Sequence, residues 1–243
     1  MIRTERSGPV LTILLDRPDR RNAMSDTLVS SLITTIRDAD HDVDVGVIIL
    51  AGAGRGFCAG SDLAGLAAMS PAGRVQFEAA SGQVARMIGQ CTKPVIAAVH
   101  GFAIGGGLTL AASCDIVITD AAAKWSMPEV PIGLFPAWGI GAIIDRLGVP
   151  AARRLCWGID TLTGTEAATS GLADLVDDNP LECAHALARR LAALPRSQAS
   201  AVKTFFSSFV PEERLDIEAN RLFLSAAVSP EAEASFVRFG GKS

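Results

Sequence analysis

The fold is constrained most by short apolar runs, two of which are followed by turns of small residues. Val45–Ala51 (VGVIILA) is apolar throughout apart from one glycine, which is typical of a strand covered on both faces. Val10–Asp16, Pro94–His100 and Asp115–Thr119 also read as strands. Helical patterns separate these runs, so the sequence predicts an α/β fold with a largely parallel sheet.

Helical signals fill the intervals and then take over the end of the chain. Ser25 is a predicted N-cap for a helix, Ser70-Pro71 begins another that ends near Gln90, and Leu108–Cys114 is a short helix. The C-terminal part contains four predicted helices, at Leu181–Leu194, Ser197–Phe209, Pro211–Val228 and Pro230–Phe239. We therefore expect an α/β core over residues 1–190 and a helical subdomain over residues 191–243.

Composition excludes several classes of partner. The 22 basic and 26 acidic residues give a net charge of −4, which argues against a nucleic-acid binder. The N-terminus lacks the apolar segment of a signal peptide, and no apolar run of about 18 residues could span a membrane. We expect a cytoplasmic protein without a membrane partner. Five widely spaced cysteines and three separated histidines favour buried, reduced thiols over disulfides or a metal site.

Gly105-Gly106-Gly107, placed before a predicted helix, leaves backbone N–H groups unobstructed. Such donors can hold a phosphate or a developing oxyanion, but a tight packing turn is an equally good interpretation of the glycines alone. The pattern matches neither a dinucleotide fingerprint nor a P-loop. Phe57–Leu63 (FCAGSDL) is a second turn of small residues after a strand. Two such turns can direct two N–H groups at one oxygen atom.

Glu129 lies in the apolar, proline-rich segment Ser126–Gly133 (SMPEVPIG). Burial there would raise its pKa, as a proton-transfer group at neutral pH requires. The alternative is a solvated glutamate in a loop.

The segments GFCAGSDL, GFAIGGGLTLAASCDI and MPEVPIGLFP, preceded by LDRPDRRNAM, resemble the crotonase (enoyl-CoA hydratase/isomerase) superfamily in order and spacing. The resemblance runs from about residue 10 to the C-terminus. It implies a ββα spiral whose helical C-terminal subdomain serves in oligomerisation and CoA contact. It further implies a homotrimer or a dimer of trimers acting on an acyl-CoA thioester, with CoA as part of the substrate and no separate cofactor.

The resemblance also implies roles for individual residues. The N–H groups of Ser61 and Gly106 would form an oxyanion hole for the thioester oxygen, and Glu129 would transfer a proton. Trp138 would line the acyl pocket. The cradle for CoA and its pantetheine arm would include Arg21, Ala23, Ala59, Gly60, Asp62 and Leu63, with Asp62 a turn or cap residue and not a catalyst.

Thr109 stands where hydratases of this family carry a second glutamate. A hydroxyl can orient water but cannot act as a base at neutral pH, whereas one carboxylate suffices to shift a double bond. The sequence therefore favours an enoyl-CoA isomerase. Ala137 argues against dienoyl-CoA isomerases and dehalogenases, which have an aspartate there. A hydratase, a hydratase-lyase and a catalytically silent scaffold that binds CoA esters remain alternatives; an RNA-binding role is disfavoured by the negative charge.

Overall fold

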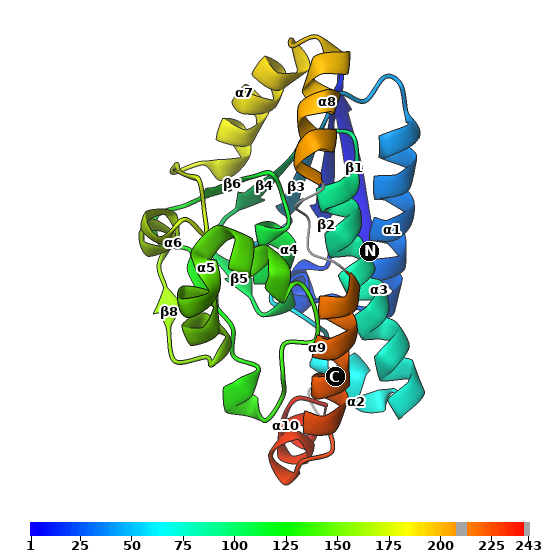
Figure 1. The fold of residues 1–243 in the computed structure, drawn as a ribbon, viewed down its shortest axis with the longest axis vertical. Helices are drawn as coiled ribbons and strands as arrows, with labels where there is room; N and C mark the ends of the chain where they lie inside the picture. Colours follow the sequence, from blue (N-terminus) through cyan, green and yellow to red (C-terminus); the bar gives the residue numbers. More distant parts are fainter. Residues whose placement is uncertain (208–212, 241–243) are drawn as a thin grey trace.

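The computed structural model describes residues 1–207 and 213–240, and its centre is a six-stranded sheet (Figure 1). In order across the sheet, the strands are β1 (Ile2–Ser7), β2 (Val10–Leu15), β3 (Val47–Gly52), β4 (Val95–Val99), β6 (Ile116–Thr119) and β9 (Leu175–Val176). β1 pairs antiparallel with β2, and the other neighbours are parallel. The predicted α/β fold with a largely parallel sheet is confirmed.

A smaller sheet contains β5 (Phe102–Ile104), β7 (Lys124–Ser126) and β8 (Thr161–Leu162). β4 leads into β5 and then α4 (Gly106–Ala112), while β6 leads into β7 and then the short helix η2 (Val130–Ile132). The bridge between Cys58 and Ala103 extends this pattern to the segment after β3. Each turn of the chain thus adds to the large sheet, then to the small sheet, then forms a helix. This is the expected ββα spiral.

Helices cover both faces of the large sheet. Leu50 and alternating neighbours pack against α1 (Asp26–His41), α3 (Pro71–Gln90) and α4. The opposite face, which includes Ile49, packs against α7 (Pro180–Ala192). All six residues of β3 are buried, which accounts for its continuous apolar run. Burial of each large aliphatic side chain contributes about 1.5–3 kcal/mol.

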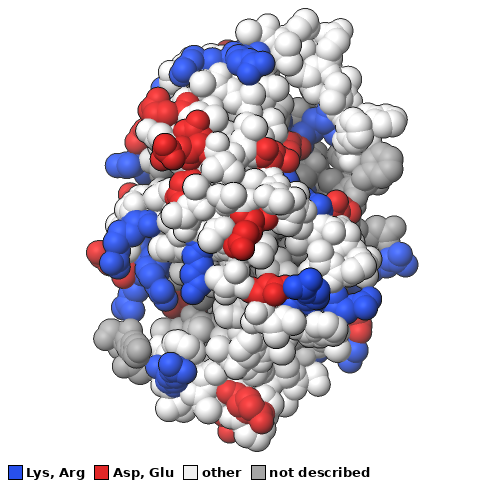
Figure 2. All heavy atoms as spheres, turned by 90° about the vertical axis from the view of Figure 1, so that its left-hand side faces the viewer, with Lys and Arg blue, Asp and Glu red and all other residues white. Residues whose placement is uncertain are grey.

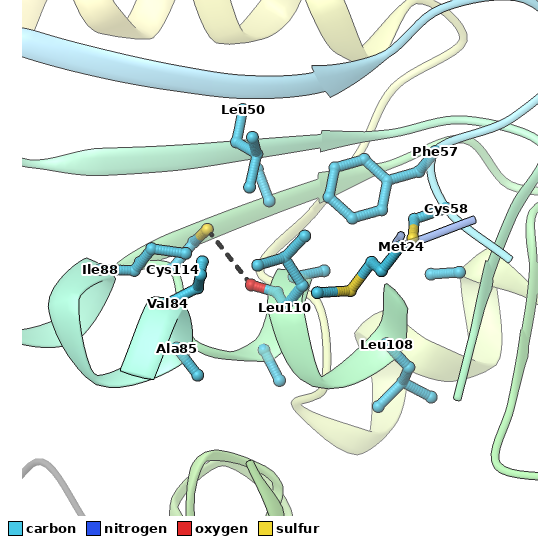
Figure 3. Close-up of a cluster of buried hydrophobic side chains, with 14 of the residues drawn as sticks. Met24, Leu50, Phe57, Cys58, Val84, Ala85, Ile88, Leu108, Leu110 and Cys114 are labelled. Atoms are coloured by element: carbon cyan, nitrogen blue, oxygen red, sulfur yellow. Dashed lines mark hydrogen bonds between the residues drawn. The ribbon is translucent and has the colours of Figure 1, made fainter. Parts of the chain in front are cut away.

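The short helix α4 lies inside the core. Figure 3 shows Leu108 and Leu110 of α4 in one cluster with Val84 and Ile88 of α3 and with Leu50. Every residue of α4 after Gly106 is buried, so its position is fixed by packing on several sides. The thiols are free; Cys58, Cys91 and Cys114 are buried as expected, but Cys156 and Cys183 are partly exposed.

The remaining helices pack around this core. They are η1 (Pro18–Arg20), α2 (Leu63–Ala68), α5 (Ile140–Cys156), α6 (Gly164–Ser170), α8 (Arg196–Ser207), α9 (Glu213–Ala226) and α10 (Pro230–Gly240). α9 packs on α3, and α10 packs on α2 (Figure 1). The predicted helices Ser197–Phe209 and Pro211–Val228 are present where described, but their residues 208–212 lie outside the described chain. The predicted division between residues 190 and 191 stays a prediction.

The surface carries charges of both signs. Figure 2 shows acidic and basic side chains interspersed over one face of the molecule. None of the helices in the described ranges is long and apolar enough to cross a membrane. Residues 1–207 and 213–240 also contain no group of three or more His, Cys, Asp or Glu side chains that could hold a metal ion.

Asn22 connects two loops at the carboxyl end of the sheet. Its buried side chain donates through Nδ2 to the carbonyls of Ala53 (2.8 Å) and Gly56 (2.9 Å). Its Oδ1 accepts from the N–H of Arg17 at 2.9 Å. The backbone of Asn22 is left-handed (φ 56°), a conformation that asparagine tolerates better than most residues. Asn22 therefore holds the turn after β2 against the loop after β3.

We expect Asn22→Ala to lower the free energy of unfolding by about 2–4 kcal/mol, because it leaves a buried carbonyl without its donor and strains the backbone. Urea unfolding monitored by circular dichroism measures the change. Asn179→Ala, which removes an exposed N-cap of α7, is the matched control and should cost about 1 kcal/mol. Equal losses in the two variants would contradict the structural role assigned to Asn22.

Candidate active site

Two turns of small residues meet at the start of α4. Gly60 has a positive φ of 87°, and a methyl group placed on it would lie 2.8 Å from the carbonyl oxygen of Ile104 and 3.3 Å from the nitrogen of Gly106. Within the described residues, the N–H groups of Ser61 and Gly106 donate to no acceptor. The turns therefore bring two unpaired backbone donors into one region.

The three consecutive glycines each contact a different segment. A methyl group on Gly105, which has φ 54°, would collide with Oε1 of Glu129. One on Gly106 would lie 2.9 Å from Cζ2 of Trp138, and one on Gly107 would collide with the carbonyl oxygen of Cys58. The absence of side chains thus allows a carboxylate, an aromatic ring and a second backbone to approach the same turn.

Glu129 lines a cavity of ≈ 70 Å³ at this turn. Leu66, Leu134 and Phe223 are among the cavity's apolar walls. The cavity also includes most of the residues predicted for the site, namely Ala59, Gly60, Ser61, Leu63, Gly106, Thr109 and Trp138. Segments more than 75 positions apart in the sequence therefore surround one small space. Of the carboxylates predicted for the site, Glu129 is the one that lines it.

Burial controls the acidity of Glu129. Oε2 has no hydrogen-bond partner and is inaccessible to solvent, so the ionised form loses hydration without compensation. This desolvation raises the pKa of Glu129 to about 7, against a smaller lowering by its own backbone N–H. The carboxyl group is therefore partly ionised at neutral pH, as a group that both accepts and releases protons must be.

The C-terminal helices hold the segment that carries Glu129 and Trp138. Gly133 has φ 78°, and a methyl group there would lie 2.6 Å from the nitrogen of Ala232 in α10. Gly139 donates its N–H to Oδ1 of Asp216 in α9 at 3.0 Å. Asp216 also pairs with Arg86 of α3. The segment from Gly133 to Gly139, which borders the cavity, is thus held at both ends by contacts with α9 and α10.

The hydroxyl proton of Thr109 is engaged within α4. The hydroxyl donates to the carbonyl of Gly106 at 2.9 Å, within the first turn of α4. The residue is buried, and a methyl group on Gly139 would lie 2.7 Å from its Cβ. Backbone therefore packs against one side of Thr109, while the residue also lines the cavity.

Three predicted substrate contacts lie outside the cavity. Arg21 is exposed and has a left-handed backbone (φ 52°), and its carbonyl accepts from Ala59. Ala23 accepts from the Arg17 guanidinium through its carbonyl at 2.6 Å. Asp62 caps α2 by accepting from Gly65 and pairs with Arg17 at 3.0 Å, so its expected role as a cap residue matches the geometry. Contact of these residues with CoA stays a prediction.

Glu78 is the titratable cavity residue that the sequence analysis did not predict. It lies on α3, only 3% of its surface is exposed, and it lines the same cavity as Glu129. Desolvation, and to a smaller extent the charge of Glu129, raise the pKa of Glu78 to about 8, while a hydrogen bond from Trp138 lowers it. The sequence did contain a signal for its burial. Glu78 lies four and seven positions before Gly82 and Ala85, so it shares a helix face with small residues that can pack closely against a neighbouring segment.

Comparisons with known proteins agree on one family. The family model for enoyl-CoA hydratase/isomerase matches residues 5–234. A probable enoyl-CoA hydratase of Mycobacterium tuberculosis is 34% identical over 93% of this chain and 88% of its own length. A short-chain-enoyl-CoA hydratase of Clostridium acetobutylicum is also 34% identical, over 71% of this chain and 67% of its own.

A solved structure shows the same fold over nearly the whole chain. An enoyl-CoA hydratase/isomerase from Mycobacterium paratuberculosis superposes with a TM-score of 0.91 at 25% identity, covering 98% of this chain and 97% of that one. The spiral of strands and the helices after it are therefore common to both proteins.

The pKa of Glu129 is higher in the folded protein than in the unfolded chain. As pH rises, Glu129 therefore loses its proton at a lower pH in the unfolded chain than in the folded protein. Stability contributed by the protonated group is complete below pH about 4.5 and is lost as pH rises toward 7. We expect Glu129→Gln to match the wild type in unfolding free energy near pH 4 and to exceed it by up to about 3 kcal/mol at pH 8.

Chemical denaturation at both pH values measures this difference. Glu5→Gln, which changes an exposed carboxylate on β1, is the control and should show no such pH dependence. A Glu129→Gln protein that is less stable than the wild type at pH 8 would contradict the uncompensated burial of this carboxylate.

Proposed function

The chain belongs to the enoyl-CoA hydratase/isomerase family, and we propose that it is an enoyl-CoA isomerase, which moves a double bond from C3–C4 to C2–C3 of an acyl-CoA thioester. The coarser assignment, an acyl-CoA enzyme, follows from the family. The isomerase assignment is supported by the composition of the cavity.

In the proposed reaction, the thioester oxygen lies between the N–H groups of Ser61 and Gly106. Ionised Glu129 removes a proton from C2, and the electron pair moves toward the thioester oxygen to give a dienolate. The two donors stabilise this developing charge, an interaction whose loss typically costs about 10²–10³-fold in rate. A proton is then delivered to C4, the C2–C3 double bond forms and the carbonyl is restored.

One observation carries the proposal. Glu129 is a buried carboxylate with an unpaired oxygen, in the same cavity as two unpaired backbone donors. Thr109 occupies the position from which hydratases of this family present a second glutamate, and its hydroxyl is already engaged with Gly106. A water molecule at that position therefore lacks the carboxylate that would activate it, whereas proton removal from C2 needs only Glu129.

Hydration of a 2-enoyl-CoA is the second candidate, for a specific reason. The curated relatives described above are named hydratases, and Glu78 places another carboxylate in the cavity. Hydration needs one group to deprotonate water and one to protonate the α-carbon. Glu78 and Glu129 together could meet that requirement from two different elements.

Parallel assays distinguish these functions. The isomerase converts a 3-enoyl-CoA to the conjugated 2-enoyl-CoA and forms no 3-hydroxyacyl-CoA from a 2-enoyl-CoA in water, with products separated by chromatography. Rapid hydration of the 2-enoyl-CoA would show that the second candidate is correct. Binding of both esters without turnover would identify a catalytically silent scaffold.

We expect Glu129→Gln to lower kcat for the 3-enoyl-CoA by about 10²–10⁴-fold, because the amide cannot accept the C2 proton. KM should change by only about threefold, since the N–H donors remain in place. Steady-state kinetics measure both constants, and Glu5→Gln is the control. A Glu129→Gln enzyme that retains wild-type kcat would contradict the proposed role of Glu129, whichever reaction the protein catalyses.

A further inference from the structure

The cavity contains a second carboxylate that the proposed reaction has not yet used. Among its described lining residues, Glu78 and Glu129 are the two side chains that titrate at ordinary pH. They come from different elements, since Glu78 lies in the middle of α3 and Glu129 lies at the start of η2. The charge of Glu129 acts on Glu78, so the two groups are close enough to interact.

Trp138 connects Glu78 to the glycine turn. Its side chain lies close enough to the Glu78 carboxyl group to lower the pKa of that group. One edge of its ring lies against Gly106, and its Cβ would be 3.2 Å from a methyl group on Gly82, one helical turn after Glu78. Trp138 itself is buried (3% exposed), so this orientation is fixed by packing. Glu78 therefore lies in the wall of the same cavity as Gly106, with Trp138 between α3 and the glycine turn.

No cation of α3 neutralises Glu78. Arg74 donates to the carbonyl of Leu66 at 2.9 Å, and Arg86 pairs with Asp216 on α9. Within the described residues no ion pair involves Glu78. A buried carboxyl group without a cation is held largely in its neutral form, and such groups concentrate at functional sites.

We propose that Glu78 is the acid of the isomerisation and delivers the proton to C4, while Glu129 removes the proton from C2. This inference rests on the proposed function. The C2–H bond breaks and its proton passes to the Glu129 carboxylate. The Glu78 O–H bond then breaks as the C4–H bond forms, and the electron pair of the dienolate becomes the C2–C3 double bond. A proton passes from Glu129 back to Glu78, directly or through solvent, and restores the starting state without net change.

The environments of the two groups support this division of labour. Burial raises the pKa of Glu78 to about 8 and that of Glu129 to about 7, so one group can hold a proton at neutral pH while the other is ionised. Glu129 is the group that contacts the glycine turn, where the thioester carbonyl and C2 would lie, so the base is assigned to Glu129 and the acid to Glu78. Pairs of carboxyl groups whose surroundings separate their pKa values commonly divide into an acid and a base.

Deuterium exchange in heavy water tests the proposal with the full chain and a 3-enoyl-CoA. In the wild type, the 2-enoyl product should carry solvent deuterium at C4. Glu78→Gln should lower isomerisation by about 10²-fold while the remaining substrate still exchanges its C2 hydrogen at a rate within about threefold of the wild type. Mass spectrometry and nuclear magnetic resonance of samples quenched early measure both processes.

Variants separate an acid from a merely structural residue. Glu78→Asp, which keeps an ionisable acid, should recover at least about tenfold of the lost activity, whereas Glu129→Gln should lose C2 exchange and isomerisation together. The kcat of the wild type should fall above pH about 8 as Glu78 ionises, and the residual activity of Glu78→Gln should lack that fall. Glu5→Gln should behave as the wild type in all three measurements.

The outcomes distinguish the two proposals. If the wild type neither isomerises the substrate nor exchanges its C2 hydrogen, the proposed function is wrong, and so is the role of Glu78 as the acid. An active wild type whose Glu78→Gln variant isomerises within about threefold overturns the acid role alone. Simultaneous loss of C2 exchange and isomerisation in a folded Glu78→Gln protein shows that Glu78 positions Glu129, which also overturns the acid role.

Discussion

Close contact between two backbone turns determines the geometry of this molecule. The turn at Gly60 meets the turn at Gly105–Gly107 at distances that leave no room for side chains. The large sheet makes this contact possible because β3 and β4 are parallel neighbours, so the turns that follow them start from the same edge. α4 then anchors its turn in the core through Leu108 and Leu110. The position of the proposed oxyanion hole is therefore set by the packed core of the fold.

Two buried sites among the described residues treat charge differently. Lys203 is buried away from the cavity, where it pairs with Asp115 and also donates to the carbonyl of Ile88. Glu78 and Glu129 instead share a cavity without a cation, an arrangement that costs stability and makes both groups weaker acids. The extensive packing on both faces of the sheet allows the fold to tolerate this cost. The same desolvation that weakens the fold brings the two groups into the pH range where proton transfer is useful.

Sequence reasoning predicted the features that local patterns encode. The four longest parallel strands, the helices at 26–41 and 71–90, and the turns around Ser61 and Gly106 all follow from apolar runs and glycine positions. β5, β7, β8 and β9 were missed because two or three residues cannot establish a periodicity. β1 was missed because it is largely exposed and contains no apolar run. Glu78 was missed for a different reason: its role depends on how α3 is rotated against Trp138, a residue 60 positions later that fixes which helix face meets the cavity. Likewise, no local pattern showed that Asp62 would turn toward Arg17.

The support that α9 and α10 give to the Glu129 segment has a consequence for synthesis of the protein. A nascent chain emerges from the ribosome with its N-terminus first, and the strands of the large sheet are complete once residue 176 is available. The segment between Gly133 and Gly139 gains its contacts with Asp216 and Ala232 only after those two residues, at least 40 positions beyond the last strand, have been added. The segment that carries Glu129 is therefore fixed later in synthesis than the sheet. A chain interrupted between residues 192 and 216 contains the sheet and the helices that cover its two faces, but it lacks the contacts that hold this segment.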